Sequence, residues 1–389
     1  MFQWKTRAYA LLAAGAIALG MTAPADAGDR RHDRHDRHDR HERSEPLVIA
    51  HRGASGYVPE HTLAAYYIAI QQGADFVEPD LVITKDGVLV ARHENEIGGT
   101  TNVAEKAEFA SRRTTKIIDG VSITGWFTED FTLAELKTLR AKERIPQIRP
   151  ANARFDGMFE IPTLEEVLLL VDSVNEQRKR LAHGKDRDRV KRVGVYPETK
   201  HPTYFQKLGL PLEEPLVRLM HRYGYNSAKD AAFIQSFETA NLRKLSRMTK
   251  IPLVQLVDAA GKPWDFVVAN DPRTYADLVK PAGLKQIAQY ASGLGANKNL
   301  IIPRTQTGFL GTPTTLIRDA HAAGLIVHGW TFRAENSFLP RDFQSSTDPA
   351  GIGGLETEVK RFLELGMDGF FTDHPDIGVE ARNELVRRR

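Results

Sequence analysis

The chain has 389 residues, of which 41% are hydrophobic and 26% are charged, so it is long and apolar enough to bury a large core. Its 53 basic and 50 acidic residues leave a net charge of +3, which argues against a dedicated nucleic-acid-binding protein. No internal apolar run is long enough to span a bilayer. The chain has no cysteine, so the fold must depend on its core and on any bound metal rather than on disulfides.

The amino terminus has the pattern of an export signal. Lys5 and Arg7 precede an apolar stretch at 8–19, which is followed by Ala25-Asp26-Ala27. This order of charge, apolar stretch and small-residue site predicts a signal peptide over residues 1–27. Without a cysteine there is no site for lipid attachment of the lipobox kind, so we expect a soluble protein that is periplasmic or secreted.

Residues 28–45 form a polar leader that repeats His-Asp-Arg three times and then has His-Glu-Arg. The segment is nearly neutral and has almost no apolar residues, so we expect it to be disordered. Imidazoles in such a tract can bind transition metals, but a solvated leader is the favoured interpretation. The folded domain is predicted to span 46–389.

The first elements of this domain carry several polar residues. An apolar strand at 47–50 ends at His51 and Arg52, and a glycine-rich turn leads to a helix at 62–72. The next strand, 76–83, carries Glu78 and Asp80 on one face. After a turn at 85–87, a strand at 88–92 ends at His93.

Residues 95–160 show no clean alternation of strand and helix, and we interpret them as an insertion after the second βα region, over one end of the domain. Beyond it, strands and helices alternate regularly. The expected helices are 163–180, 212–223, 240–248, 274–292, 314–323 and 356–365, with a final helix after 376. The expected strands are 192–197, 232–235, 252–257, 300–303, 326–332 and 369–372. About eight βα steps in one domain predict an α/β fold of the (β/α)8, or TIM-type, barrel class. An open doubly wound sheet is the alternative, but no glycine-rich dinucleotide loop supports it.

Charged and titratable residues recur where these strands end. Three carboxylates meeting at one mouth of a barrel would repel each other unless a cation lay among them, and all-oxygen ligation selects a hard ion such as Ca²⁺ or Mg²⁺. Two histidines beside such a site can act as acid and base. Arginine and lysine would attract an anionic substrate. The set favours phosphoester cleavage, and its members are His51, Arg52, Glu78, Asp80, His93, Glu198 and Lys200.

These motifs resemble the glycerophosphodiester phosphodiesterase family, and specifically its exported bacterial branch. The matching segments are HRGASGYVPEHT at 51–62, EPDLVITKDG at 78–87, RH at 92–93, YPETK at 196–200 and DGFFTDHPD at 368–376. The resemblance covers about residues 47–380, and five motifs in the right order make it specific.

The resemblance implies a role for individual residues. It implies that Glu78, Asp80 and Glu198 hold a divalent metal, often Ca²⁺, with Mg²⁺ or another divalent ion as alternatives. His51 and His93 would be the catalytic pair, and Arg52 and Lys200 would bind the phosphate. Gln235, Phe237 and Trp330 match less closely and would line the glycerol pocket. The sequence departs from the family pattern at Glu94, where aspartate is common. It also matches poorly across 95–160 and the loop after Trp330, and these segments bear on leaving-group preference more than on the chemistry.

The expected reaction is hydrolysis of small-molecule glycerophosphodiesters, such as glycerophosphocholine and glycerophosphoethanolamine, to sn-glycerol 3-phosphate and an alcohol. A phospholipase-D-like lyase acting on lipids would use a similar barrel and metal site, but it would want an apolar rim. A non-catalytic periplasmic phosphoester-binding protein would be favoured if either histidine were absent, and both are present.

Overall fold

The computed structural model describes residues 45–184 and 190–388, which include nearly all of the predicted phosphodiesterase domain. The predicted signal peptide and, apart from Glu45, the predicted leader lie outside the described residues. Among the described residues, no helix is both long and apolar enough to cross a membrane.

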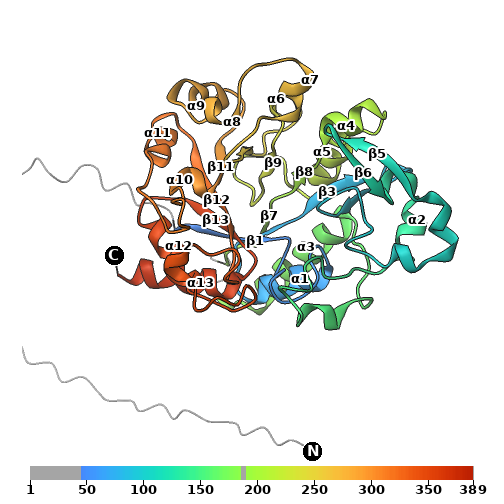
Figure 1. Ribbon diagram of the computed structural model, residues 1–389, viewed down its shortest axis with the longest axis horizontal. Helices are drawn as coiled ribbons and strands as arrows, with labels where there is room; N and C mark the ends of the chain where they lie inside the picture. Colours follow the sequence, from blue (N-terminus) through green and yellow to red (C-terminus); the bar gives the residue numbers. More distant parts are fainter. Residues whose placement is uncertain (1–44, 185–189, 389) are drawn as a thin grey trace, which may run out of the picture. The chain divides into compact units, whose positions relative to one another are not determined.

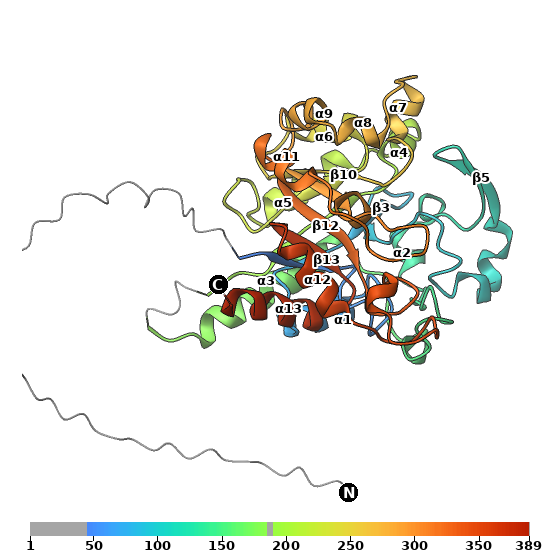
Figure 2. The same ribbon diagram turned by 60° about the vertical axis from the view of Figure 1, so that its left-hand side comes forward.

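A ring of parallel strands forms the centre of the domain, and helices lie around it (Figures 1 and 2). Ring closure follows from the strand pairs: β13 pairs with β1, β1 with β2, β2 with β7, and β8 with β9. The strands of the ring are β1 (Leu47–His51), β2 (Phe76–Glu78), β3 (Asp80–Ile83), β7 (Gly194–Val195), β8 (Glu198–Thr199), β9 (Ile234–Ser236), β10 (Leu253–Val257), β11 (Gly293–Asn297), β12 (Ile326–Phe332) and β13 (Gly369–Thr372).

Prolines interrupt two positions of the ring. Pro79 separates β2 from β3, and Pro197 follows Tyr196 between β7 and β8; neither proline has an N–H to donate to a neighbouring strand. β2 pairs with β7, and β3 pairs with β8. β2 and β3 therefore share one position in the ring, and β7 and β8 share the next. The described strands therefore close an eight-position barrel, which confirms the predicted (β/α)8 class.

The helices that follow the strands bury apolar faces against the barrel. Thr62 and Thr163 cap two of them by accepting hydrogen bonds from backbone N–H groups in the first turn. The principal helices are α1 (Leu63–Gln71), α3 (Leu164–Leu181), α5 (Glu213–Arg222), α6 (Thr239–Leu245), α9 (Pro281–Ile287), α11 (Leu316–Ala322), α12 (Leu355–Leu363) and α13 (Pro375–Arg387). Shorter helical turns are α4 (Pro202–Lys207), α7 (Trp264–Val268), α8 (Tyr275–Leu278) and α10 (Lys298–Ile301).

Two of the predicted elements, a strand and a helix, are wrong. The predicted strand at 300–303 begins in helix α10, and the sixth position of the ring is filled by β11 instead. The predicted helix at 274–292 is divided into α8 and α9, because Pro281 begins a new helix at its first position.

Residues 95–160 contain an antiparallel hairpin, β5 (Thr114–Ile118) and β6 (Val121–Gly125), that does not join the ring. They also contain one short α-helix, α2 (Leu133–Leu136), and the 3₁₀ turns η1 (Val103–Glu105), η2 (Ala107–Arg112), η3 (Thr128–Asp130) and η4 (Asn152–Phe155). The hairpin and α2 lie to one side of the barrel in Figure 1. They follow β4 (Leu89–Ala91), which pairs antiparallel with β3.

Candidate active site

A cavity of about 330 Å³ lies at the carboxyl ends of the barrel strands, and it collects most of the residues that the sequence singled out. The predicted site residues that line it are His51, Arg52, Glu78, His93, Glu198, Lys200, Gln235, Phe237 and Trp330. The tenth, Asp80, lies beside Glu78 and Glu198 in the acidic cluster described next. These residues come from β1, β2/β3, β8, β9 and β12 and from the turn after β4, so the barrel gathers them from distant parts of the chain.

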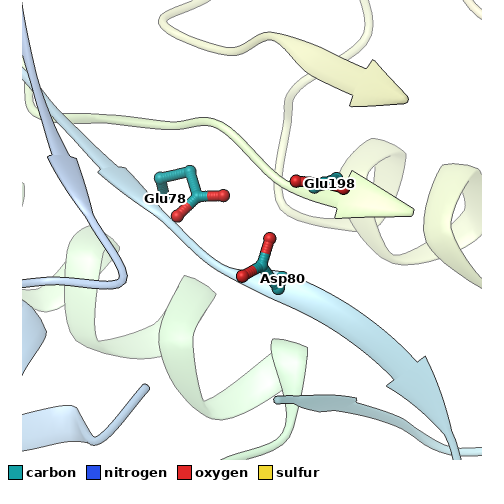
Figure 3. A group of neighbouring side chains, drawn as sticks. All are labelled: Glu78, Asp80 and Glu198. Carbon is teal, nitrogen blue, oxygen red and sulfur yellow. The ribbon is translucent and has the colours of Figure 1, made fainter. Parts of the chain in front are cut away.

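Glu78, Asp80 and Glu198 form a buried acidic triad (Figure 3). One carboxylate oxygen from each lies within 4.8 Å of the other two. The strand register explains the cluster, because Asp80 on β3 pairs with Glu198 on β8. Glu78 is the last residue of β2, and only Pro79 separates it from Asp80. Their side chains face a common space in Figure 3.

The electrostatics of the triad fit a divalent cation. Burial, and then the charges of Asp80 and Glu198, raise the pKa of Glu78, while burial raises the pKa of Glu198 to about 8. Although burial opposes it, Lys200 and His61 hold the pKa of Asp80 well below its usual range. The Oδ1 atom of Asp80 is buried and has no hydrogen-bond partner among the residues that the structure describes. Carboxylates that repel each other and a free buried oxygen are the donor set that a hard divalent ion would satisfy.

Two cations flank the triad. Arg52 lies in the left-handed region, with φ +60°, and its backbone N–H donates to Glu78 Oε2 at 2.9 Å. Its guanidinium donates to Glu60 at 3.0 Å and lies 3.3 Å from Asp80 Oδ2. Lys200 Nζ lies 3.1 Å from Glu198 Oε1. Burial opposes the charge of both cations, but the surrounding carboxylates raise the pKa of each, so both stay protonated.

The two histidines differ in their supports. His51 Nδ1 lies 2.6 Å from Asp373 Oδ1, whereas His93 Nδ1 lies 2.9 Å from Glu94 Oε1. Burial, followed by the charge of Arg52, lowers the pKa of His51 to about 4. The same causes lower the pKa of His93 to about 3. Both imidazoles are therefore neutral at pH 7 in the ligand-free site.

Asp373 was not among the predicted site residues. It lies just after β13, is 2% exposed, and accepts hydrogen bonds from Arg149 Nη2 at 2.6 Å and Arg333 Nε at 2.8 Å as well as contacting His51. Its place after a barrel strand, inside the closing DGFFTDHPD segment, is a signal that could have identified it. Arg149 comes from the 95–160 segment and is 224 residues away in sequence, so no local pattern could have paired it with Asp373.

Further contacts fix the orientation of the triad and the pocket wall. His61 Nε2 lies 2.9 Å from Asp80 Oδ2, and Gln235 Nε2 donates to Glu78 Oε1 at 3.0 Å. Trp330 donates from its indole N–H to the Gly295 carbonyl at 2.9 Å. The ring of Phe237 meets the Trp330 ring edge-on, with centroids 5.7 Å apart. Gln235 therefore orients a triad carboxylate, while the two aromatic rings wall the cavity.

Comparison with known proteins agrees with this arrangement. The glycerophosphoryl diester phosphodiesterase family model matches residues 51–377. A glycerophosphodiester phosphodiesterase of Arabidopsis thaliana is 37% identical over 343 residues, which cover 85% of this chain and 84% of that protein. The enzyme of the same name from Haemophilus influenzae is 28% identical over 404 residues, covering 97% and 98% of the two chains.

Solved structures share the fold. A phosphodiesterase from Oleispira antarctica, in complex with its product sn-glycerol-3-phosphate, aligns with a TM-score of 0.56 and 19% identity over 87% of this chain and 97% of its own. A glycerophosphodiester phosphodiesterase from Agrobacterium tumefaciens aligns with a TM-score of 0.50 and 19% identity, covering 86% and 99%. The chain therefore belongs to the glycerophosphoryl diester phosphodiesterase family and is an enzyme with glycerophosphodiester phosphodiesterase activity.

Proposed function

We propose that the enzyme hydrolyses glycerophosphodiesters such as glycerophosphocholine and glycerophosphoethanolamine to sn-glycerol 3-phosphate and a free alcohol, and that it depends on a divalent metal. The single observation that carries the metal dependence is the buried triad of Glu78, Asp80 and Glu198, whose oxygens lie within 4.8 Å of one another. The product complex of the Oleispira antarctica enzyme supports sn-glycerol 3-phosphate as the released half.

The substrate phosphate would lie between the triad and the two flanking cations. Arg52 offers a planar guanidinium that suits phosphate oxygens, and Lys200 offers a compact ammonium. A cation held by Glu78, Asp80 and Glu198 would supply further positive charge to stabilise the charge that develops on the phosphoryl oxygens. Only oxygen ligands are present in this cluster, so we propose Ca²⁺ as the ion, with Mg²⁺ as the alternative.

His51 is assigned as the general base. Its Nδ1 faces the Asp373 carboxylate, which can only accept, so Nδ1 carries the proton and Nε2 is left free to take one. The nucleophile is water, or the adjacent glycerol hydroxyl; in the second case a cyclic phosphate forms first, and water then opens it to sn-glycerol 3-phosphate. As the oxygen of the nucleophile bonds to phosphorus, its proton moves to His51.

His93 is assigned as the general acid that gives a proton to the leaving alkoxide as the P–O bond to the head group breaks. This role needs a protonated imidazole, whereas burial, followed by the charges of Arg52 and Lys200, lowers the pKa of His93. A bound phosphodiester carries a negative charge that opposes those two cations, so the pKa of His93 is higher with substrate bound than in the same site without substrate.

We further propose that the enzyme acts outside the cytoplasm, in the periplasm or as a secreted protein, after removal of residues 1–27. The motif pattern at the amino terminus supports this. We also propose that 95–160 is an insertion into the barrel, and that its hairpin and loops affect head-group preference.

The experiment is an assay of glycerol 3-phosphate release from glycerophosphocholine and glycerophosphoethanolamine, with and without a strong chelator. Release that the chelator stops and added Ca²⁺ restores is the expected result. Full release in the chelator would contradict the metal dependence, and release of no product from any diester would contradict the proposed substrates.

A further inference from the structure

The cavity has a second polar wall, across the barrel from the acidic triad. Counting round the ring from the β2/β3 position, β11 is the fourth strand in either direction. Asn297 ends β11, and Lys298, Asn299 and Arg304 follow it; all four line the same cavity as the triad. A substrate whose phosphate lies over Glu78 and Glu198 would therefore extend one of its ends toward this wall.

Arg304 is an uncommitted cation on that wall. Its Nη2 donates to the carbonyl of Phe338, which holds the side chain in place. Its Nε is buried and has no hydrogen-bond partner, and no carboxylate in the part of the chain that the structure describes forms an ion pair with its guanidinium. A buried donor that lacks an acceptor is costly, and a bound ligand could supply the acceptor.

The neighbouring charges do not neutralise the positive charge of Arg304. Lys298 Nζ lies 2.7 Å from Glu358 Oε1, and both side chains are buried. This pair is neutral as a whole, whichever of its two members holds the shared proton. The positive charge of Arg304 therefore stays on the wall, where Asn299 and Ser337 add polar groups.

We propose that Arg304 is a specificity-determining residue that binds an anionic group on the alcohol half of the substrate, a carboxylate or a second phosphate. The inference rests on the proposed function, because it assumes that a glycerophosphodiester occupies the cavity. A guanidinium with free donors matches an anion better than the neutral hydroxyls of glycerol. A volume of about 330 Å³ suits one small molecule of this kind.

Two pairs of substrates isolate the anionic group. Glycerophosphoserine differs from glycerophosphoethanolamine only by a carboxylate. Glycerophosphoglycerol can be compared with its derivative that carries a terminal phosphate on the second glycerol. For each pair, the ratio of the two kcat/KM values is measured on one enzyme preparation, so the ratio does not depend on the fraction of enzyme that is folded.

The expected result is a ratio above one in the wild type for at least one pair, and a drop in that ratio by about tenfold to a hundredfold in Arg304→Gln, as for loss of a hydrogen bond to a charged group. Arg304→Lys, which keeps the charge but loses the fork, should give an intermediate ratio. The matched control is Arg318→Gln on α11, whose side chain is 76% exposed, and its ratio should equal that of the wild type.

The pair that responds identifies the anion as carboxylate, phosphate or both. Equal losses on both members of each pair would place Arg304 against the glycerol or the reacting phosphate and overturn the proposal, as would a ratio that Arg304→Gln leaves unchanged or a wild type that prefers neither anionic substrate. If glycerophosphoethanolamine is hydrolysed in these cases, the proposed function stands without the subsite. If no diester is hydrolysed, both proposals fall.

Discussion

Replacing Asp373 with asparagine tests whether Asp373 orients His51 for catalysis in addition to stabilising the barrel. Asp373 is buried and contacts His51, Arg149 and Arg333 at 2.6, 2.6 and 2.8 Å. Removing one charge from a buried ion pair destabilises a protein by about 3–5 kcal/mol. The amide of asparagine can also donate to Nδ1, which would place the proton on the Nε2 atom of His51. General base catalysis contributes about 10²–10⁴-fold, so kcat should fall by that factor.

Glu335→Gln is the matched control, because Glu335 is also buried and also pairs with Arg149, at 2.5 Å, but does not contact His51. Denaturant unfolding should show a loss of similar size in both variants. Only Asp373→Asn should lose kcat, measured as glycerol 3-phosphate release at a temperature where both variants are folded. A folded Asp373→Asn enzyme that keeps kcat within about threefold of the wild type would refute the assignment of His51 as an oriented base. So would an equal loss of kcat in Glu335→Gln.

Three further predictions concern the metal, the histidines and the leader. Asp80→Asn should abolish activity and remove the rise in melting temperature that excess Ca²⁺ gives the wild type, a stabilisation of about 2.7 kcal/mol at a hundredfold excess over Kd; an unchanged Ca²⁺-dependent shift would exclude Asp80 as a ligand. His93→Ala should cripple cleavage of glycerophosphocholine but do less damage to cleavage of a nitrophenyl phosphodiester, whose leaving group needs no proton, whereas His51→Ala should harm both alike; the reverse pattern in steady-state kinetics would exchange the two roles. Deleting residues 28–44 should leave turnover and melting temperature nearly unchanged; a large loss of either would show that the leader contributes to the folded domain.

The parts of the site that lie next to strand ends were predictable from sequence. Glu78 and Asp80 stand in an apolar run, and His51 directly follows one, so a polar residue there signals the mouth of a barrel. The residues that hold the site residues in place were harder to predict from sequence. Arg149 approaches Asp373 from the stretch between α2 and η4, which has no helix or strand, and such a contact depends on tertiary packing that no periodicity encodes.

The misplaced strand has a specific physical cause. β11 consists of Gly293-Leu294-Gly295-Ala296-Asn297, and small residues of this kind have low β propensity. The structure gives one packing reason for a small residue here: a Cβ on Gly295 would lie 2.5 Å from Leu256 Cδ2, so a larger residue would require the Leu256 side chain on β10 to shift. The apolar run at 300–302 was the stronger strand pattern, but short apolar runs do not distinguish a strand from a buried helical turn.

A last prediction concerns pH and the buried His328, which does not belong to the acidic triad. Its Nδ1 lies 2.9 Å from the Tyr196 hydroxyl, and its Nε2 is buried with no partner within the described ranges 45–184 and 190–388. Burial lowers its pKa from 6.5 to about 4. Between these two values the unfolded chain binds a proton that the folded chain does not, so stability is lost as pH falls from about 6.5 toward 4. At about 1.4 kcal/mol per pKa unit, this histidine accounts for about 3 kcal/mol of that loss.

Other buried histidines and carboxylates titrate in the same range, so the measurement is the difference in unfolding free energy between the wild type and His328→Asn. The difference should be largest above pH 6.5 and should shrink by about 3 kcal/mol by pH 4. Two parallel pH profiles would mean that His328 is not the neutral, buried group that the structure places inside the barrel.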